Sequence, residues 1–319
     1  FPCILYCVLN CRERVSLYVK YASTFLLLAV AYCFIEESIS ANPIMHWCEN
    51  NQSSFTWLID RTESRFGVKR AQSFFADVVP FGISAAYTFI LLFIFQRDRN
   101  QIMQKKWRRI LLVLLPICVF MTGTRSVIMC FLLASVSLLT VTTIKRYRFQ
   151  LLIFALFIAL FMGSYLGSIY DSIFVDSAEL GGSSSDMREG QWDIAFFYMA
   201  QDFWVGNGIG FTGNLLAQGG VAGLFGAEGM WLPIMMDTGM LGVIGVLISF
   251  IIGLISILYR KKYNLIWIWA SFLLLKTITT GVGVEPTYYE VILVVLFRYL
   301  QFNEYPKNKN YDFNNNSSL

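Results

Sequence analysis

Residues 233–258 have the sequence PIMMDTGMLGVIGVLISFIIGLISIL, and this run decides the class of the fold. It is longer than the roughly 20 mostly apolar residues that a helix needs to cross a bilayer. Similar runs recur along the chain, which is 56% hydrophobic and only 14% charged, whereas a soluble domain carries roughly 25% charged residues. The sequence therefore predicts an all-α polytopic membrane protein, with one transmembrane multi-helix bundle over residues 1–319.

The apolar runs predict eight spans, near residues 20–36, 74–95, 110–123, 126–144, 149–169, 233–258, 264–281 and 287–302. The chain begins with Phe1, and residues 1–10 resemble the end of a helix. We therefore expect an incomplete N-terminus rather than a signal peptide.

Lysine and arginine gather in every second connection between these spans, as the positive-inside rule requires of cytoplasmic loops. The cationic connections contain Arg12, Arg14 and Lys20, then Arg97 to Arg109, then Lys145 to Arg148, and finally Arg260 to Lys262. The alternate connections, 37–73, 123–126, 170–232 and 282–286, are predicted to face outward. Because these cations sit at the ends of apolar runs, the net charge of +4 does not indicate nucleic-acid binding.

The largest outward connection, 170–232, is polar and holds nine of the chain's 23 glycines between Gly206 and Gly229. Irregular backbone cannot lie in hydrocarbon with its polar groups unpaired, so we expect a large periplasmic loop on the membrane face. Residues 208–213 fit the pattern GxGxxG, but no strand precedes them, which excludes a dinucleotide cradle. No metal is expected either, because the chain has one histidine, His46, and no CxxC spacing.

Three outward arginines lie beside span ends or in the large loop: Arg70, Arg125 and Arg188. A guanidinium stays charged and binds phosphate in bidentate fashion. A cation at a membrane boundary also needs a partner, and no carboxylate lies near Arg125 in sequence. An anionic ligand fits all three, although Arg70 could snorkel to the surface and Arg188 could pair with Asp186 or Glu189.

The arginines fall within three recognisable motifs: Arg188-x-x-x-Trp192-x-x-Ala195 followed by Gly206-x-Gly208-x-Gly210; Thr122-Gly123-Thr124-Arg125; and Arg70-x-x-x-Phe74-Phe75-Ala76-Asp77 with a late Pro80. Together they resemble the signature of bacterial O-antigen polymerases and ligases, whose corresponding turn is TGSR. Where the ligase branch has a histidine after the glycine loop, this chain has Glu228, and Asp237, Gly239 and Gly242 follow in register.

The resemblance implies a GT-C-type membrane glycosyltransferase of the bacterial inner membrane, with its active site facing the periplasm. Such enzymes take a glycan from an undecaprenyl-pyrophosphate carrier, invert the anomeric centre and use no metal or other cofactor. Arg125 and Arg188 would then hold the diphosphate, with Arg70 as a third member, because fixed cations stabilise the charge that develops on the leaving group. Glu228 is the candidate general base, although it could instead pair with Arg188.

The missing histidine favours a repeat-unit polymerase over a ligase that uses lipid A-core as acceptor. A transporter of lipid-linked sugars is the alternative from another class, but it should place charges near the midplane of repeated halves. Trp192 and Trp231 are candidates for sugar contact or for anchoring at the membrane interface. Lys276 and Glu285 form a further polar pair near the outward end of the seventh span. Besides the lipid-linked oligosaccharide and the bilayer, a chain-length regulator and a flippase of the same pathway are the expected partners.

Overall fold

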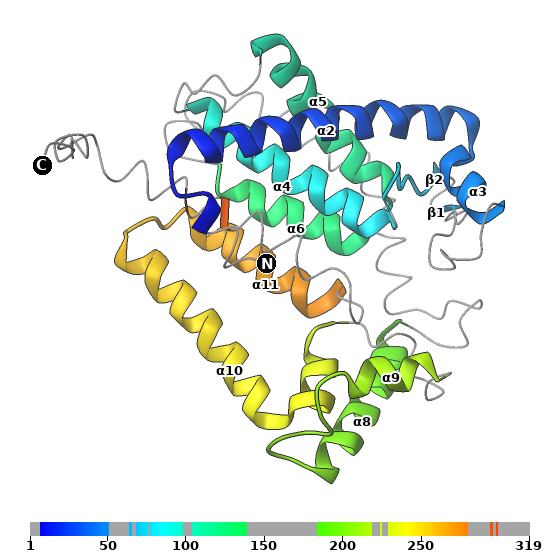
Figure 1. The fold of residues 1–319 in the computed structure, drawn as a ribbon, viewed down its shortest axis with the longest axis vertical. Coiled ribbons are helices and arrows are strands. Elements are labelled where there is room, and N and C mark those ends of the chain that lie inside the picture. The colour runs from blue at the N-terminus through cyan, green and yellow to red at the C-terminus, as the bar shows by residue number, and fades with distance from the viewer. Residues whose placement is uncertain are drawn as a thin grey trace, which may run out of the picture.

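A computed structural model describes residues 7–50, 64–65, 68–75, 77–97, 104–138, 184–218, 224, 229–279, 294–295 and 298. Its helices are α2 (Arg12–Ile39), α3 (Pro43–Asn50), α4 (Val78–Arg97), α5 (Lys105–Met121), α6 (Arg125–Val136), α8 (Ser184–Gln201), α9 (Phe211–Ala217), α10 (Trp231–Tyr259) and α11 (Leu265–Thr279) (Figure 1). Two short strands, β1 (Ser64–Arg65) and β2 (Val68–Lys69), pair antiparallel.

The main bundle consists of α2, α4, α5, α6 and α11, which share one hydrophobic core. Helix α11 packs against α6, α4 packs against α5 and α6, and α2 crosses α4 and α5. One polar contact joins the middle of the bundle, where the hydroxyl groups of Tyr87 on α4 and Ser271 on α11 lie 3.0 Å apart. In Figure 1 the end of α2, the start of α4 and the start of α6 lie on the right of the bundle.

Helices α8 and α9 form a second, smaller cluster against the first turns of α10. Its buried residues are Ala195 of α8, Leu224, and Leu232 and Met236 of α10. Helix α10 contacts both α8 and α11, so it connects this cluster to the main bundle (Figure 1).

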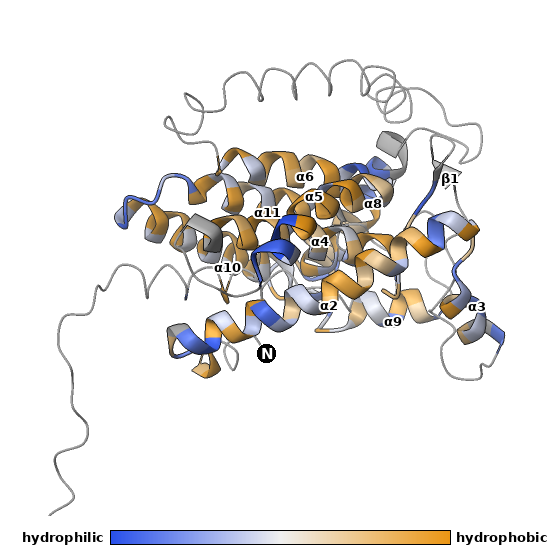
Figure 2. Cartoon of the chain, turned by 90° about the horizontal axis from the view of Figure 1, so that it is seen from above, coloured by the Kyte–Doolittle hydropathy of each residue, from blue (hydrophilic) through white to orange (hydrophobic). Residues whose placement is uncertain are grey.

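Helix α10 is bent at Gly239, whose φ of 60° and ψ of −155° are not helical. Beyond the bend it is strongly apolar, like most of the bundle helices in Figure 2, and most of its large side chains are exposed. Helices α10 and α2 are both long and apolar enough to cross a membrane. Exposed leucines and isoleucines along such a helix are the expected surface of a membrane protein, because lipid solvates them.

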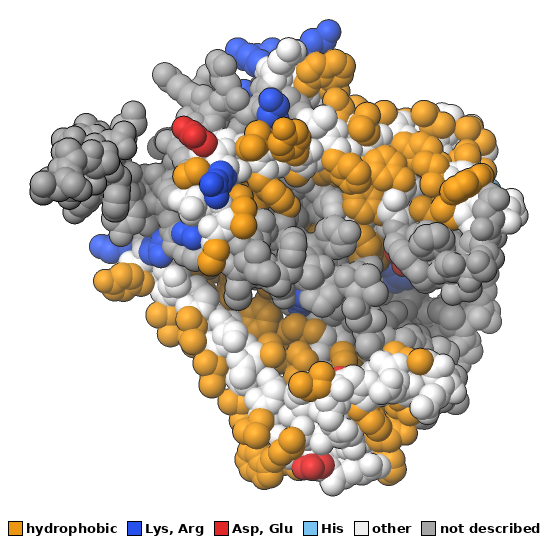
Figure 3. All heavy atoms as spheres, in the orientation of Figure 1, with side chains coloured by type: hydrophobic (Ala, Val, Ile, Leu, Met, Phe, Trp, Pro, Cys, Tyr) orange, Lys and Arg blue, Asp and Glu red, His pale blue; other side chains and the backbone are white. Residues whose placement is uncertain are grey.

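The cations gather at one end of the bundle. Figure 3 shows lysine and arginine side chains mainly along the upper and left edges, where Figure 1 places the start of α5 and the turn between α10 and α11. This is the end at which the sequence predicts the cytoplasmic side.

The all-α class is confirmed, and helices form at the six predicted spans that fall on described residues, with shifted boundaries. Of these six helices, α2 and α10 are long and apolar enough to cross a membrane. Helix α6 differs most from the prediction, since it ends at Val136 rather than near residue 144. Its last amides turn tightly, Ser137 N–H bonding to Ala134 and Leu138 N–H to Ser135, which is how many helices end. The spans expected at 149–169 and 287–302 lie almost wholly outside the described residues.

The described part of the predicted loop 170–232 is largely helical, because residues 184–201 form α8 and residues 211–217 form α9. The high glycine content of the segment favoured the prediction of a loop over that of helices. Most of the glycines lie between and after these helices, whereas α8 contains one, Gly190.

Candidate functional site

Arg70 lies against the turn between α5 and α6. It is only 8% exposed, and its Nε donates to the carbonyl oxygen of Thr122 at 3.3 Å, while Nη2 donates to Oγ1 of Thr124 at 3.2 Å. The backbone follows the same course, because Ala71 N–H donates to the carbonyl oxygen of Met121 at 3.1 Å. The structure therefore brings Arg70 to the residue next to Arg125, although the two are far apart in sequence.

The turn that presents Arg125 is tightly fixed. Gly123 has a φ of +59°, a left-handed conformation that glycine adopts without strain. Thr122 is buried, and its hydroxyl donates to the carbonyl oxygen of Val119 at 2.7 Å. On α4, a Cβ added to Gly82 would lie 3.0 Å from Val127 Cγ1 and 3.1 Å from Thr122 Cγ2. This close packing fixes the backbone position of Arg125, which is the half-buried first residue of α6.

Glu36 of α2 holds the segment that carries Arg70, a role that was not predicted from the sequence. Its carboxylate is fully buried and accepts the backbone N–H groups of Gln72 at 3.4 Å and Ser73 at 2.7 Å. The ammonium group of Lys69 lies 3.6 Å from the same carboxylate. Buried carboxylates are stable when their charge is both paired and hydrogen-bonded, so Glu36 holds the backbone after Arg70 and the side chain of Lys69 before it.

A second set of contacts continues this anchor towards α3. The side-chain amide of Asn42 donates to the carbonyl oxygen of Ser73 at 2.6 Å, and Tyr32 donates to Oδ1 of Asn42 at 2.8 Å. Ser73 itself has a φ of 55° and donates through its hydroxyl to the carbonyl oxygen of Ala29 at 2.8 Å. Residues 69–73 are thus held by α2 from one side and by the turn after α5 from the other.

Arg188 stands apart from this arrangement. It is exposed on the second turn of α8, and α8 packs against α10, whereas Arg125 opens α6. Three residues further on, Gln191 is fully buried and its amide nitrogen donates to the carbonyl oxygen of Leu224 at 3.0 Å. Arg188 is therefore exposed on a helix whose position depends on the second cluster.

The glycine loop after α8 is organised by Asp237 of α10. One carboxylate oxygen accepts the N–H of Gly210 at 2.9 Å, and the other accepts the N–H and hydroxyl of Thr212 at 2.8 and 2.6 Å. The N–H of Gly208 donates to the carbonyl oxygen of Asp237 at 2.9 Å. The N–H groups of Gly208, Gly210 and Thr212 are thus all engaged by Asp237 within the protein.

The loop ends on α11. Met230 N–H donates to the carbonyl oxygen of Lys276 at 3.0 Å, and Trp231 Nε1–H donates to Oγ1 of Thr277 at 3.2 Å. A Cβ on Gly229, whose φ is +88°, would lie 2.4 Å from the carbonyl oxygen of Thr277. Glu228 lies outside the described residues, but its neighbour Gly229 is therefore fixed against the last turns of α11, close to the buried Lys276.

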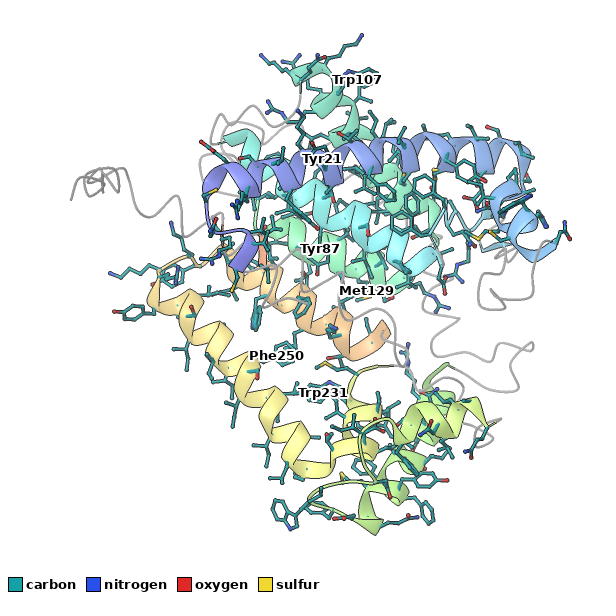
Figure 4. The ribbon with its side chains drawn as sticks, viewed as in Figure 1. Tyr21, Tyr87, Trp107, Met129, Trp231 and Phe250 are labelled. Atoms are coloured by element: carbon teal, nitrogen blue, oxygen red, sulfur yellow. The ribbon has the colours of Figure 1, made fainter. Side chains whose placement is uncertain are left out.

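The two tryptophans considered for sugar contact both have partners inside the protein. Trp192 is half-buried in the second cluster, with its ring 5.9 Å from that of Phe196. Trp231 packs beside Phe250, 6.5 Å between ring centres, in the space between α10 and α11 (Figure 4). These contacts account for the burial of both indoles.

The described part of this end of the molecule offers cations and hydrogen-bond donors, which suit an anionic ligand. Over the described ranges, His, Cys, Asp and Glu side chains form no group of three that could hold a metal ion.

One comparison with known proteins bears on this site. Residues 110–247 match a protein-family model described as O-Antigen ligase. The match includes Arg125, Arg188, Glu228 and Asp237, and it ends before Lys276; Arg70 and Glu36 precede it. No curated protein matches the chain.

Proposed function

We propose that this chain is a membrane glycosyltransferase of polysaccharide biosynthesis, and in particular a repeat-unit polymerase, because residues 110–247 match the O-Antigen ligase family model. It would transfer a glycan from an undecaprenyl-pyrophosphate carrier to a sugar hydroxyl of another lipid-linked repeat unit. The reaction would take place at the periplasmic face of the bacterial inner membrane, where a flippase delivers the substrates.

In this reaction the acceptor hydroxyl oxygen forms a bond to the anomeric carbon of the donor. The bond between that carbon and the pyrophosphate oxygen breaks with its electron pair, and the configuration inverts. The hydroxyl proton passes to a base, for which Glu228 is the proposed residue. Negative charge grows on the departing pyrophosphate, so the residues that stabilise it must be cations already in place.

The contact between Arg70 and the Thr122–Thr124 turn is the observation that carries the proposal. It joins two segments that only the family resemblance linked in the sequence. It also places the buried Arg70 against Thr124, the residue before Arg125. Two guanidinium groups with fixed backbones provide the bidentate donors that a diphosphate accepts. Arg188, on the adjoining cluster, is the proposed third contact, made when substrate binds.

A polymerase is preferred to a ligase because Glu228 replaces the histidine expected in the ligase branch. A transporter is less well supported, because Arg70 and the turn before Arg125 lie together at one end of the bundle rather than near its middle. Trp192 and Trp231 become second-choice candidates for sugar contact, since internal packing already explains their positions.

Deletion of the gene tests the proposed function. A polymerase mutant should keep one repeat unit attached to the lipid core and lose the longer ladder of surface polysaccharide on an electrophoretic gel. A ligase mutant should lose the attached glycan altogether and accumulate lipid-linked polymer. An unchanged polysaccharide would exclude both enzymes, and accumulation of lipid-linked single units on the cytoplasmic side would indicate a transporter.

A further inference from the structure

A row of exposed apolar side chains at the end of α8 and in the following loop has no role in the site described above. We define it as the apolar ridge, with the members Phe196, Phe197, Phe203, Trp204, Val205 and Ile209. Ile209 is 94% exposed and Trp204 is 58% exposed. Soluble surfaces rarely carry an apolar patch of this size without a partner, so the ridge requires an occupant.

The ridge is attached to the membrane-length helix α10 at a defined point. Met240 N–H donates to the carbonyl oxygen of Phe203 at 2.9 Å, and Leu241 N–H donates to that of Trp204 at 3.1 Å. The attachment is close, because a Cβ on Gly206 would lie 2.5 Å from the backbone nitrogen of Gly239. The ridge is therefore fixed beside the bend in α10.

This attachment sets the ridge at one edge of the hydrocarbon layer. The straight part of α10 from Met240 to Tyr259 is about 30 Å long at a rise of about 1.5 Å per residue, and the hydrocarbon core is also about 30 Å thick. The other end of this part meets Arg260, Lys261 and Lys262, which belong outside the hydrocarbon. The bend at Gly239 must then lie near the opposite boundary.

The exposed apolar surface of α10 is continuous with the ridge. It begins at Leu241, next to the attachment, and continues through Ile244, Leu247, Ile248, Ile251, Ile252 and Ile255. Figure 3 shows hydrophobic side chains along the lower left edge and around the lower end of the molecule, where Figure 1 places α10 and α8. The exposed carboxylates Asp193 and Asp202 lie on the same segment, which fits a position at the boundary better than one inside the hydrocarbon.

We propose that the apolar ridge is inserted into the outer boundary of the lipid bilayer and anchors α8 there. Tryptophan is enriched at this depth because its ring is apolar and its N–H is polar, and interfacial helices bind through such apolar faces. Along α8, Phe196 lies about 12 Å from Arg188 at the helical rise. The anchor would therefore hold Arg188 near the depth of lipid phosphate groups.

Fluorescence quenching in bilayers tests the anchor without any glycan, so its result does not depend on the proposed function. Wild-type protein and Trp204→Phe are placed in bilayers whose phosphatidylcholine carries bromine either near the top or near the end of the acyl chains. The difference between the two proteins isolates the emission of Trp204. We expect the shallow bromine to quench this emission most, and iodide in the water to quench it little.

Three other results would overturn the proposal. Quenching by iodide without quenching by bromine places the ridge in water, and quenching by neither shows that protein covers it. Strongest quenching by the deep bromine places the ridge inside the hydrocarbon rather than at its boundary.

A matched pair of variants gives a second measurement. Because Ile209 is almost fully exposed, Ile209→Ser removes no packing within the protein, and Ile209→Phe keeps the apolar surface. The serine variant should reduce the shallow quenching of Trp204, and the phenylalanine variant should preserve it. Equal quenching in the two variants would show that Ile209 does not contact lipid and that the ridge as defined is wrong.

Discussion

Arg125 is the residue on which the proposed chemistry depends most directly. It begins α6 after a turn that is fixed by Gly123, by the Thr122 hydroxyl and by Arg70. Such a side chain loses little freedom when it binds an anion, so its charge is available at the moment when the leaving group forms.

Arg125→Ala should lower the rate of polymerisation by about 100- to 1,000-fold, the usual effect of removing one preorganised donor. Arg125→Lys should recover only part of the rate, because an ammonium group cannot bind two phosphate oxygens in a fork. The length distribution of the surface polysaccharide and a rate measured with purified lipid-linked substrate provide the measurement. Arg109→Ala at the exposed start of α5 is the control, and a normal rate in Arg125→Ala would remove this residue from the site.

Glu36 acts through other residues. Glu36→Ala would leave the Lys69 ammonium and two buried N–H groups without their acceptor, at a cost of about 3–5 kcal/mol, as found when one member of a buried pair is removed. Glu36→Gln keeps one acceptor oxygen and should lose less. Thermal unfolding in detergent measures the stability, and the polymerisation rate of the folded fraction measures the effect on Arg70.

If Glu36 positions Arg70, the folded fraction of Glu36→Gln should show a lower maximal rate. A loss of stability with an unchanged rate per folded molecule would instead make Glu36 purely structural. No local sequence pattern predicts this residue, because its partners lie more than 30 positions away and its carboxylate falls near the end of an otherwise ordinary apolar run.

At the level of elements, the contacts between the glycine loop and α10 form a joint. This joint gives a structural reason for residues, such as Asp237 and Gly239, that the sequence analysis noted only as matching the family pattern. Asp237 accepts hydrogen bonds from Gly210 and Thr212, and Gly239 bends the helix where Gly206 approaches its backbone. These residues form one joint that fixes the end of α8, and through it Arg188, relative to α10. The family pattern at 206–242 is therefore a folding pattern as much as a catalytic one.

Gly239→Ala should disrupt this joint. Its φ of 60° with ψ of −155° is a region that essentially only glycine occupies, at a cost of about 1–3 kcal/mol for other residues. The added Cβ would also lie 2.6 Å from the backbone nitrogen of Gly206. Limited proteolysis between α8 and α9 should become faster in this variant.

Gly245→Ala is the matched control for this change. It lies in the same helix, and its added Cβ would meet no atom within 4 Å, so alanine should leave proteolysis unchanged or slow it. Equal proteolysis of the two variants would show that the bend at Gly239 does not hold the loop.

Two features of the sequence, the length of apolar runs and the order of motifs, predicted different parts of the structure at this level. Apolar length located α2, α4, α5, α6, α10 and α11, because membrane-length burial depends on composition over a long window. It missed α8 and α9, since these helices are stabilised by packing in a small cluster and by the Asp237 joint, which are tertiary contacts. Motif order suggested that Arg70 and Arg125 belong to one site. The contact between Arg70 and the turn before Arg125 could be seen only in the structure.

For the whole molecule, the alternation of cations between connections predicts one orientation, and native cysteines can test it. Cys7 is exposed just before α2, whereas Cys48 is half-exposed on α3, beyond the opposite end of that helix. Cys33, Cys118 and Cys130 are buried. A maleimide that cannot cross membranes should therefore distinguish the two ends of the bundle.

With the basic end in the cytoplasm, intact spheroplasts should be labelled at Cys48 and not at Cys7, and permeabilised cells should be labelled at both. Mass spectrometry of the two peptides identifies the labelled position, and Cys48→Ser should abolish the signal from intact cells. Labelling of Cys7 in intact cells would show that the bundle has the opposite orientation, with Arg70 and Arg125 on the cytoplasmic side. The proposed polymerase acts at the periplasmic face, so that result would also rule it out.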